Sequence, residues 1–278
     1  MERIPFGINR LDTTLDGGVP RGSVVLLAGE AGAGAREFMH TAAVMNGVAR
    51  RDEELFDLHY GQLGENAVLP DGVQYLSFTA DRREFEREVE LSMETALAHA
   101  GLEAVEFHSL ADAYFRVSPV PREWYSGEET GVTLKQRHQK RRYLLDVLSD
   151  AMSDVAPGNL VIIDSLSDLV SAISKDLEWA DIIYMIKGIR NATRRWGGLV
   201  LVHVDSETLT DLQRAQLVES CTGSLVFEWA SGGSVLARTL VLQSFRGLLA
   251  RIPEDDLVEF ETELGDAGFT VSDVRKIR

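Results

Sequence analysis

Short apolar, β-branched runs recur along the chain, and the stretches between them carry apolar residues at helical spacing. The strand-like runs occupy residues 24–28, 73–78, 104–108, 160–164, 199–204, 224–228 and 239–243. Helical patterns occupy residues 36–49, 82–101, 134–154, 176–196 and 207–219. Strands that alternate with helices in this way predict right-handed βαβ units, and therefore an α/β fold with a mostly parallel central sheet flanked by helices.

The carboxyl-terminal third departs from this alternation. Only Ala-Ser-Gly-Gly-Ser, residues 230–234, separates the last two strand runs, which predicts an antiparallel hairpin at the carboxyl-terminal edge of the sheet. Residues 253–278 begin with Pro253 and are acidic, and we expect them to form a helical tail. The sequence therefore predicts one domain over residues 1–252, followed by the tail at 253–278.

Two polar stretches interrupt the domain, near residues 51–72 and 117–133. The first contains Gly61, Gly64 and Pro70, and the second contains two glycines, two prolines and the aromatic residues Trp124 and Tyr125. Loops of this length in a compact domain are often functional or mobile. A surface excursion without a role is the alternative, and the sequence leaves both open.

Composition places the chain among globular proteins. It has 278 residues, of which 45% are hydrophobic and 26% charged, which suffices for a sizeable core. It contains neither an apolar run of membrane-spanning length nor the apolar core of a signal peptide, so we expect no membrane insertion. Cys221 is the only cysteine, so no disulfide can form within the chain, and we expect a cytoplasmic protein.

The net charge of −16 narrows the choice of partners. Arginine supplies nearly all the positive charge, because lysine occurs only at positions 135, 140, 175, 187 and 276. Acidic excess with few lysines suits a high-salt cytoplasm, where screening mutes self-repulsion. An ordinary acidic protein is the alternative. In either case a negative surface makes nucleic-acid binding an unfavourable hypothesis.

A glycine-rich loop follows the first strand run. Residues 29–37 read Gly-Glu-Ala-Gly-Ala-Gly-Ala-Arg-Glu, and the first and last glycines have the spacing of the phosphate-binding P-loop. That pattern continues with lysine and then serine or threonine, where this chain has Ala35 and Arg36. The candidate nucleotide-binding residues are Gly29, Glu30, Ala31, Gly32, Ala33, Gly34, Ala35 and Arg36. A plain strand-to-helix turn without a ligand is the alternative.

The substitutions at Ala35 and Arg36 affect phosphate binding and catalysis differently. Backbone N–H groups of such a loop attract phosphate whatever its side chains are. The lysine adds a full charge at the β- and γ-phosphates, and the hydroxyl holds Mg²⁺. Because neither side chain is present, the loop predicts weak or lost binding of ATP or ADP, makes Mg²⁺ doubtful and argues against efficient hydrolysis.

Longer motifs around the loop resemble the KaiC-like branch of the RecA-type P-loop ATPases. Residues 6–12 read Phe-Gly-Ile-Asn-Arg-Leu-Asp, and residues 15–23 read Leu-Asp-Gly-Gly-Val-Pro-Arg-Gly-Ser. Residues 160–165, Leu-Val-Ile-Ile-Asp-Ser, and residues 238–247, which end in Arg-Gly, match two later motifs. The resemblance covers roughly residues 4–250. It implies a RecA-like fold, an archaeal source and a metal-site remnant at Asp164, and together with the acidic composition it leads us to expect a haloarchaeal source.

The resemblance also marks further catalytic residues as missing. Family members carry a pair of glutamates after the second strand, where this chain has Thr79, Ala80 and Asp81. They also carry a lysine that reaches a neighbouring subunit's phosphate, and Ser244 occupies that position here. Each lost electrostatic contact of this kind typically costs about a hundredfold in rate. The combined losses indicate a pseudo-ATPase with no catalytic residues.

Three functions follow, in order of preference. The first is a regulatory or scaffold protein that acts through protein partners, with self-association also open. The second is a working ATPase in which Arg36 replaces the lysine and Asp81 or Glu30 the base. The third is a recombinase-like accessory protein that uses the basic run at residues 136–142, although such runs are usually solvated helix faces. The six histidines show no metal-ligand spacing, and His203 is expected to be a packed core residue.

Overall fold

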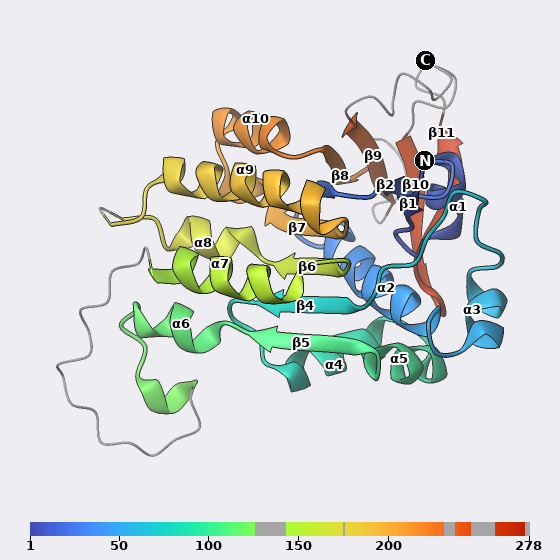
Figure 1. Ribbon diagram of the computed structural model, residues 1–278, viewed down its shortest axis with the longest axis horizontal. Coiled ribbons are helices and arrows are strands. Elements are labelled where there is room, and N and C mark those ends of the chain that lie inside the picture. Colours follow the sequence, from blue (N-terminus) through green and yellow to red (C-terminus); the bar gives the residue numbers. More distant parts are fainter. Residues whose placement is uncertain (126–142, 175, 231–236, 246–258, 276–278) are drawn as a thin grey trace.

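The computed structural model describes residues 1–125, 143–174, 176–230, 237–245 and 259–275. Its centre is a nine-stranded sheet in the order β11-β10-β9-β8-β3-β7-β6-β4-β5, with a separate two-stranded sheet of β1 and β2 (Figure 1). The strands are β1 (Arg3–Ile4), β2 (Val19–Pro20), β3 (Ser23–Gly29), β4 (Val73–Ser77), β5 (Val105–Ser109), β6 (Leu160–Asp164), β7 (Leu199–Asp205), β8 (Gly223–Trp229), β9 (Arg238–Phe245), β10 (Glu259–Gly265) and β11 (Gly268–Arg275).

Six strands from β8 to β5 run parallel, as the alternation of elements predicts. Side chains of β3 alternate between two apolar clusters, with Val25 and Leu27 on one face and Val24 and Leu26 on the other. The first cluster is covered by α2 (Ala35–Val48), α4 (Arg82–Ser92) and α5 (Thr95–Leu102). The second is covered by α6 (Ala111–Arg116), α7 (Tyr143–Val155), α8 (Leu166–Ser171), α9 (Trp179–Trp196) and α10 (Asp211–Ser220). Because both faces are covered, these strands are continuously apolar.

The seven predicted strands are all present, and the predicted helices are found with some corrections. The helix predicted at 82–101 is two helices, because Met93 is extended at φ −156° and ψ 172°. The pattern at 134–154 corresponds to α7 from Tyr143 onward, and residues 134–142 lie outside the described part. The short helices α1 (Asn9–Thr14), α6 and α8 were not predicted. No helix in the described ranges is both long and apolar enough to cross a membrane.

The insertion near 51–72 contains a short helix, α3 (Glu53–His59), which the breaker residues did not indicate. The Asp52 side chain caps it by accepting a hydrogen bond from the Leu55 N–H at 2.9 Å. In the stretch near 117–133, the described part includes the 3₁₀ turn η1 (Arg122–Trp124). The exposed Trp124 lies on this turn.

The predicted helical tail at 253–278 is wrong wherever the structure describes it. Residues 259–275 form the antiparallel pair β10 and β11, and β10 pairs with β9. The acidic residues that suggested a solvated helix alternate with buried Phe260 and Thr262, and that period of two is typical of a strand. Gly268, at φ +81°, closes the turn between the strands. The predicted β8–β9 hairpin is present, but the sheet continues past it to β11.

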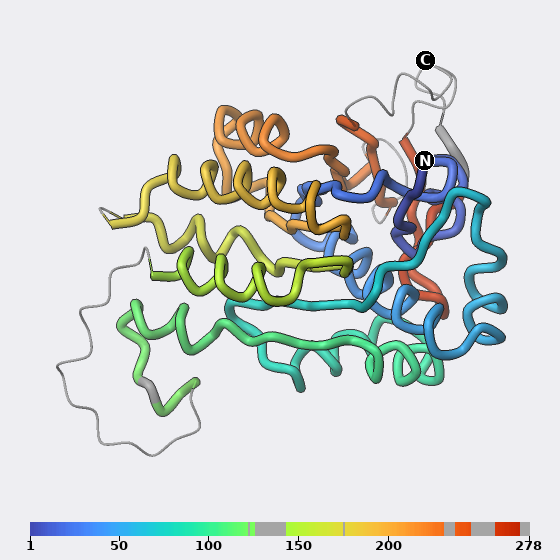
Figure 2. The backbone as a smooth tube through the Cα atoms, viewed as in Figure 1, coloured from blue at the N-terminus to red at the C-terminus, as the bar shows by residue number. Residues whose placement is uncertain are grey.

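The amino-terminal segment lies beside these last strands, where α1 (Asn9–Thr14) contacts β11 (Figure 2). Asp12 fixes its path: the fully buried carboxylate accepts N–H bonds from Phe6, Gly7 and Ile8 at 2.7, 2.9 and 3.1 Å. The Tyr60 hydroxyl donates a fourth bond at 3.1 Å. Burial raises the pKa of Asp12 to about 7, and the four hydrogen bonds oppose that rise. The aspartate of the amino-terminal motif is therefore a structural residue.

Candidate functional site

The glycines of the loop are required by its backbone geometry. Gly32 and Gly34 have φ values of +74° and +109°, which side-chain-bearing residues rarely adopt. A Cβ on Gly29 would lie 2.7 Å from the Cβ of Ala35, and one on Gly34 would lie 2.9 Å from the ring of Phe269. Between β3 and α2 the chain therefore makes a compact turn that tolerates no side chain at these three positions.

The turn leaves the backbone donors at the start of α2 without a side-chain cap. Gly34 caps α2 without any side-chain hydrogen bond, so the first N–H groups of the helix remain available. Within the turn, the Ala33 N–H is bonded to the Glu30 carbonyl oxygen at 3.0 Å. The free end of α2 also carries the positive pole of the helix dipole. This end of the helix therefore offers an anion the partial charges of a P-loop.

A cavity of about 380 Å³ lies against the turn. Of the sequence-predicted site residues, all but two line it: Gly29, Glu30, Ala31, Gly32, Gly34, Ala35 and Arg36. Ala33 is buried beneath the turn, and Asp164 lies deeper at the end of β6. The rest of the wall consists of Glu37, Ser165, Ser167, His203 and Asp205. The volume falls within the usual range for small-ligand sites, which is roughly 300–1,000 Å³.

Trp229, at the end of β8, braces one side of the loop. Its indole N–H donates to the Ala31 carbonyl oxygen at 3.2 Å, and its backbone N–H donates to a Glu30 carboxylate oxygen at 3.2 Å. The Arg238 guanidinium stacks over the indole, 5.0 Å from the ring centre. The Glu30 carboxylate is therefore held by Trp229, the same residue that contacts the loop backbone.

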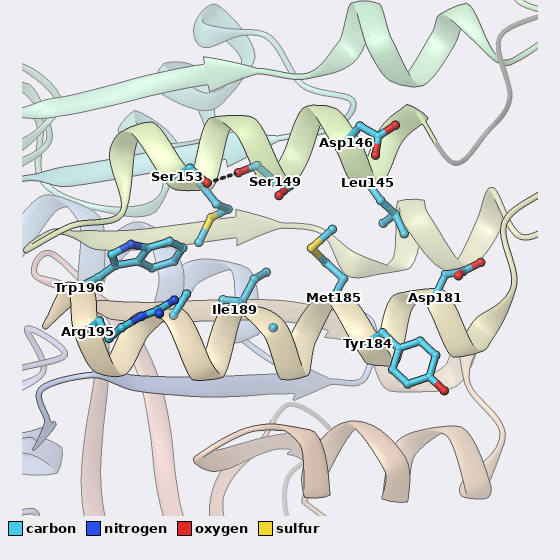
Figure 3. Close-up of a pocket in the computed structure, with 13 residues that line it drawn as sticks. Leu145, Asp146, Ser149, Ser153, Asp181, Tyr184, Met185, Ile189, Arg195 and Trp196 are labelled. Carbon is cyan, nitrogen blue, oxygen red and sulfur yellow. Dashed lines mark hydrogen bonds between the residues drawn. The ribbon is translucent and has the colours of Figure 1, made fainter.

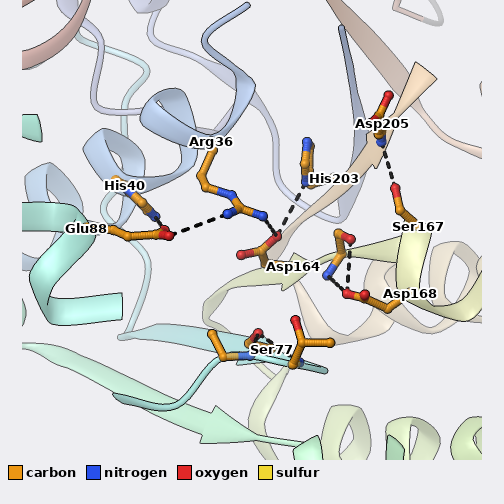
Figure 4. Close-up of polar contacts among 12 residues, drawn as sticks. Arg36, His40, Ser77, Glu88, Asp164, Ser167, Asp168, His203 and Asp205 are labelled. Atoms are coloured by element: carbon orange, nitrogen blue, oxygen red, sulfur yellow. Dashed lines mark hydrogen bonds and ion pairs between the residues drawn. The ribbon is translucent and has the colours of Figure 1, made fainter. Parts of the chain in front are cut away.

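Arg36 turns away from the loop toward the sheet (Figure 4). Its Nη2 lies 3.7 Å from Asp164 Oδ1, and its Nη1 lies 3.5 Å from Glu88 Oε1 on α4. The side chain is 49% exposed, so one part of it borders the cavity while its guanidinium forms two ion pairs. Asp164 raises the pKa of Arg36, and the group is charged at every physiological pH.

The Asp164 carboxylate lies at the carboxyl end of β6 and interacts with three side chains. Besides Arg36, His203 Nδ1 lies 3.4 Å from Oδ1, and the Tyr75 hydroxyl donates to Oδ2 at 2.9 Å. Burial by itself raises the pKa of Asp164, but the interactions with His203, Arg36 and Tyr75 outweigh it and hold the pKa at about 2. The carboxylate is therefore ionised and already neutralised from within the protein.

The Asp164 shift predicts an acid-dependent loss of stability. Its pKa is about 2 in the folded chain and about 3.9 when unfolded, so the ionised form favours the fold above about pH 4. This contribution disappears as the pH falls to about 2. We expect wild type to lose roughly 2 kcal/mol more unfolding free energy across that window than Asp164→Asn. Urea unfolding of both proteins from pH 6 to pH 2 measures the difference, and parallel curves would contradict it.

His40 and Glu88 extend the network on the side away from the cavity. His40 Nε2 lies 3.7 Å from Glu88 Oε2, and burial lowers the pKa of His40 to about 4, so the ring is neutral at pH 7. Among the residues that the structure describes, Arg36 is therefore the cation that pairs with Glu88. Asp81, considered above as a substitute base, caps α4 by accepting the Glu84 N–H at 2.9 Å. Ser244 lies on β9, and Arg246 and Gly247 lie outside the described residues.

Sequence reasoning missed much of this network. His203 was expected to be a packed core residue, yet it borders the cavity and faces Asp164. A signal existed, because β6 and β7 are adjacent parallel strands whose carboxyl ends meet at one edge, with Ile163 paired to Val202. Glu88 and His40 gave no such signal, since their positions depend on how α4 and α2 pack. Tyr75 lies on β4, which is paired with β6 in the sheet.

A second cavity, of about 490 Å³, lies between α7 and α9 (Figure 3). Its floor is apolar, with Leu145, Met152 and Ile189, and Asp146, Asp181 and Arg195 lie around it. The loop cavity, with its backbone donors and shifted groups, is therefore the candidate site.

Comparison with solved structures finds this fold in two archaeal proteins. The KaiC-like protein PH0186 from Pyrococcus horikoshii OT3 is 16% identical with a TM-score of 0.62, and the match covers 98% of this chain and 99% of that chain. Flagellar accessory protein FlaH from Methanocaldococcus jannaschii is 17% identical with a TM-score of 0.60, and the match covers 99% and 100%. No family profile and no curated protein sequence matches the chain. The chain thus has the RecA-like P-loop fold of these KaiC-like and FlaH structures.

Proposed function

We propose that the chain is a KaiC-like protein without ATPase activity, which acts as a regulatory or scaffold protein through protein partners and binds nucleotide only weakly. One observation carries the proposal: the only cation on the cavity wall, within the described residues, is Arg36, and its guanidinium is paired with Asp164 and Glu88. Phosphoryl transfer depends on positioned charge, and this charge is already engaged.

The balance of charge around the cavity supports weak binding. Three carboxylates, those of Glu30, Glu37 and Asp205, line the same wall as Arg36. Ala35 contributes no charge at the position where a P-loop lysine would stand. The backbone donors of the turn therefore supply most of the attraction for a phosphate, without the full positive charge that a P-loop lysine adds.

The rival function, a working ATPase, needs a base close to the cavity. Asp81 and Glu30 were the candidates, but Asp81 caps a helix and Glu30 accepts a bond from Trp229. The recombinase-like reading rests on residues 136–142, which lie outside the described part, and the net charge of −16 opposes it. That charge fits a haloarchaeal cytoplasm, which we propose as the setting.

Calorimetric titration of the full chain with ATP and with ADP, in Mg²⁺ at high salt, tests the proposal. We expect a Kd of about 1 mM or weaker, equivalent to a binding free energy of roughly −4 kcal/mol. Micromolar binding accompanied by phosphate release that disappears in Arg36→Ala would favour the working ATPase instead.

A further inference from the structure

Mg²⁺ does not fit the residues at this site. The ion takes six oxygen ligands in near-octahedral geometry at about 2.0–2.1 Å. The position that would supply a hydroxyl ligand holds the Arg36 guanidinium, which has five N–H donors and no acceptor. Its Nη2 stands 3.7 Å from Asp164 Oδ1, the carboxylate that the resemblance assigns to the metal. The position that supplies a Mg²⁺ ligand in a P-loop is therefore occupied by a positively charged side chain, Arg36.

The surroundings of Asp164 agree with this assignment. Oδ1 is buried and has no hydrogen-bond partner within the described residues, so its neighbours are Arg36 Nη2 and His203 Nδ1 at 3.7 and 3.4 Å. Oδ2 is satisfied by the Tyr75 hydroxyl. The charge that offsets this buried carboxylate therefore comes from a side chain that also borders the phosphate loop cavity.

We propose that the loop cavity takes a polyphosphate anion without a divalent metal ion, with Arg36 as the resident cation in place of Mg²⁺. The inference rests on the weak nucleotide binding proposed above and adds its metal independence. The ligand class is a nucleoside di- or triphosphate or inorganic pyrophosphate. The anion meets the backbone donors of the turn on one side and the guanidinium on the other.

The assignment reverses the expected effect of neutralising Asp164. In a metal-dependent site this carboxylate helps to hold Mg²⁺, so its loss weakens binding of the metal–nucleotide complex. Here it competes with the anion for Arg36, so Asp164→Asn should bind ATP about threefold to tenfold more tightly than wild type. The sign of the change separates the two arrangements.

The experiment is calorimetric titration of the full chain with ATP, ADP and pyrophosphate, each in excess Mg²⁺ and in EDTA at matched ionic strength. For wild type we expect the two affinities to agree within about twofold, because a guanidinium needs no metal. Arg36→Ser should lose about tenfold in EDTA and recover most of it in Mg²⁺, since it restores a hydroxyl beside Asp164. Comparing the three ligands separates a nucleotide site from a general phosphate site.

Matched variants control for folding and for general charge effects. Arg51→Ser removes an arginine paired with Glu103, about 20 Å away beyond the far end of α2, and should leave both affinities unchanged. Asp146→Asn on α7 is the control for Asp164→Asn, and it should also leave both affinities unchanged. Circular dichroism confirms that each variant is folded, and Arg36→Lys keeps a cation should Arg36→Ser fail to fold.

Each outcome has a distinct meaning. Binding by wild type that requires Mg²⁺, or Asp164→Asn that weakens it, overturns the metal-independent site and leaves the inactive nucleotide-binding protein standing. No binding of any polyphosphate in either buffer also overturns it, and leaves a scaffold. Turnover of ATP would contradict the proposed function itself.

Discussion

The double substitution Ala35→Lys with Arg36→Thr should raise the affinity for MgATP by about tenfold to a hundredfold. The new lysine adds a charge-assisted hydrogen bond, worth roughly 1.5–3 kcal/mol, at the first helical position beside the turn. The introduced threonine frees Asp164 from its ion pair and provides the missing hydroxyl ligand for Mg²⁺. The backbone needs no change, because Gly29, Gly32 and Gly34 already form the turn.

Calorimetry with and without Mg²⁺ measures this gain, and Ala35→Lys alone is the matched control. The single variant keeps Arg36 beside Asp164, so it should gain affinity without gaining metal dependence. Phosphate release should stay low in both, since neither change supplies a base. If the double variant binds no better than wild type, the turn is not a phosphate cradle and the alternative of a plain strand-to-helix turn holds.

Asp12→Ala should lower the free energy of unfolding by roughly 3–4 kcal/mol. The change leaves three backbone N–H groups and the Tyr60 hydroxyl without an acceptor, and each buried unsatisfied group costs about 1–3 kcal/mol. Water entry offsets part of that sum. Burial of the Asp12 carboxylate is itself unfavourable, as its raised pKa of about 7 shows. Removing the carboxylate removes this cost, which offsets another part of the loss in unfolding free energy.

Urea unfolding followed by circular dichroism measures the loss, with Tyr60→Phe as control. The control removes one donor and leaves the three backbone bonds in place, so it should cost about 1 kcal/mol. Equal losses in the two variants would mean that the carboxylate does not hold the amino-terminal segment through its backbone.

The central sheet was predictable because its strands are covered on both faces. Residues 24–28 and 160–164 are apolar almost throughout and are buried. Short runs of this kind are typical of parallel strands that helices cover on both faces. The strand pair β10–β11 was missed because its acidic residues suggested a helix, although Phe260, Thr262 and Phe269 alternate with them as in a strand. Its place beside α2 depends on long-range packing, such as the contact of Phe269 with Phe38, which no local pattern encodes.

The site was predictable in part, for a similar reason. The loop residues and Asp164 follow strand ends, and the carboxyl ends of parallel strands meet at one edge of the sheet. The sequence also identified Arg36 as a cation at the hydroxyl position. It could not show that the guanidinium forms ion pairs with Asp164 and Glu88, because α4 supplies Glu88 from a distant part of the chain.

Single-turnover phosphate release tests most directly whether Arg36 has replaced the catalytic metal site. The full chain, in excess over radiolabelled ATP with Mg²⁺ at high salt, is sampled over hours against Asp164→Asn and a protein-free blank. We expect all three to release phosphate at the same rate. Working enzymes typically reach about one turnover per second or more. If wild type released phosphate at such a rate and Asp164→Asn released it more slowly, Arg36 would not have replaced the catalytic metal site.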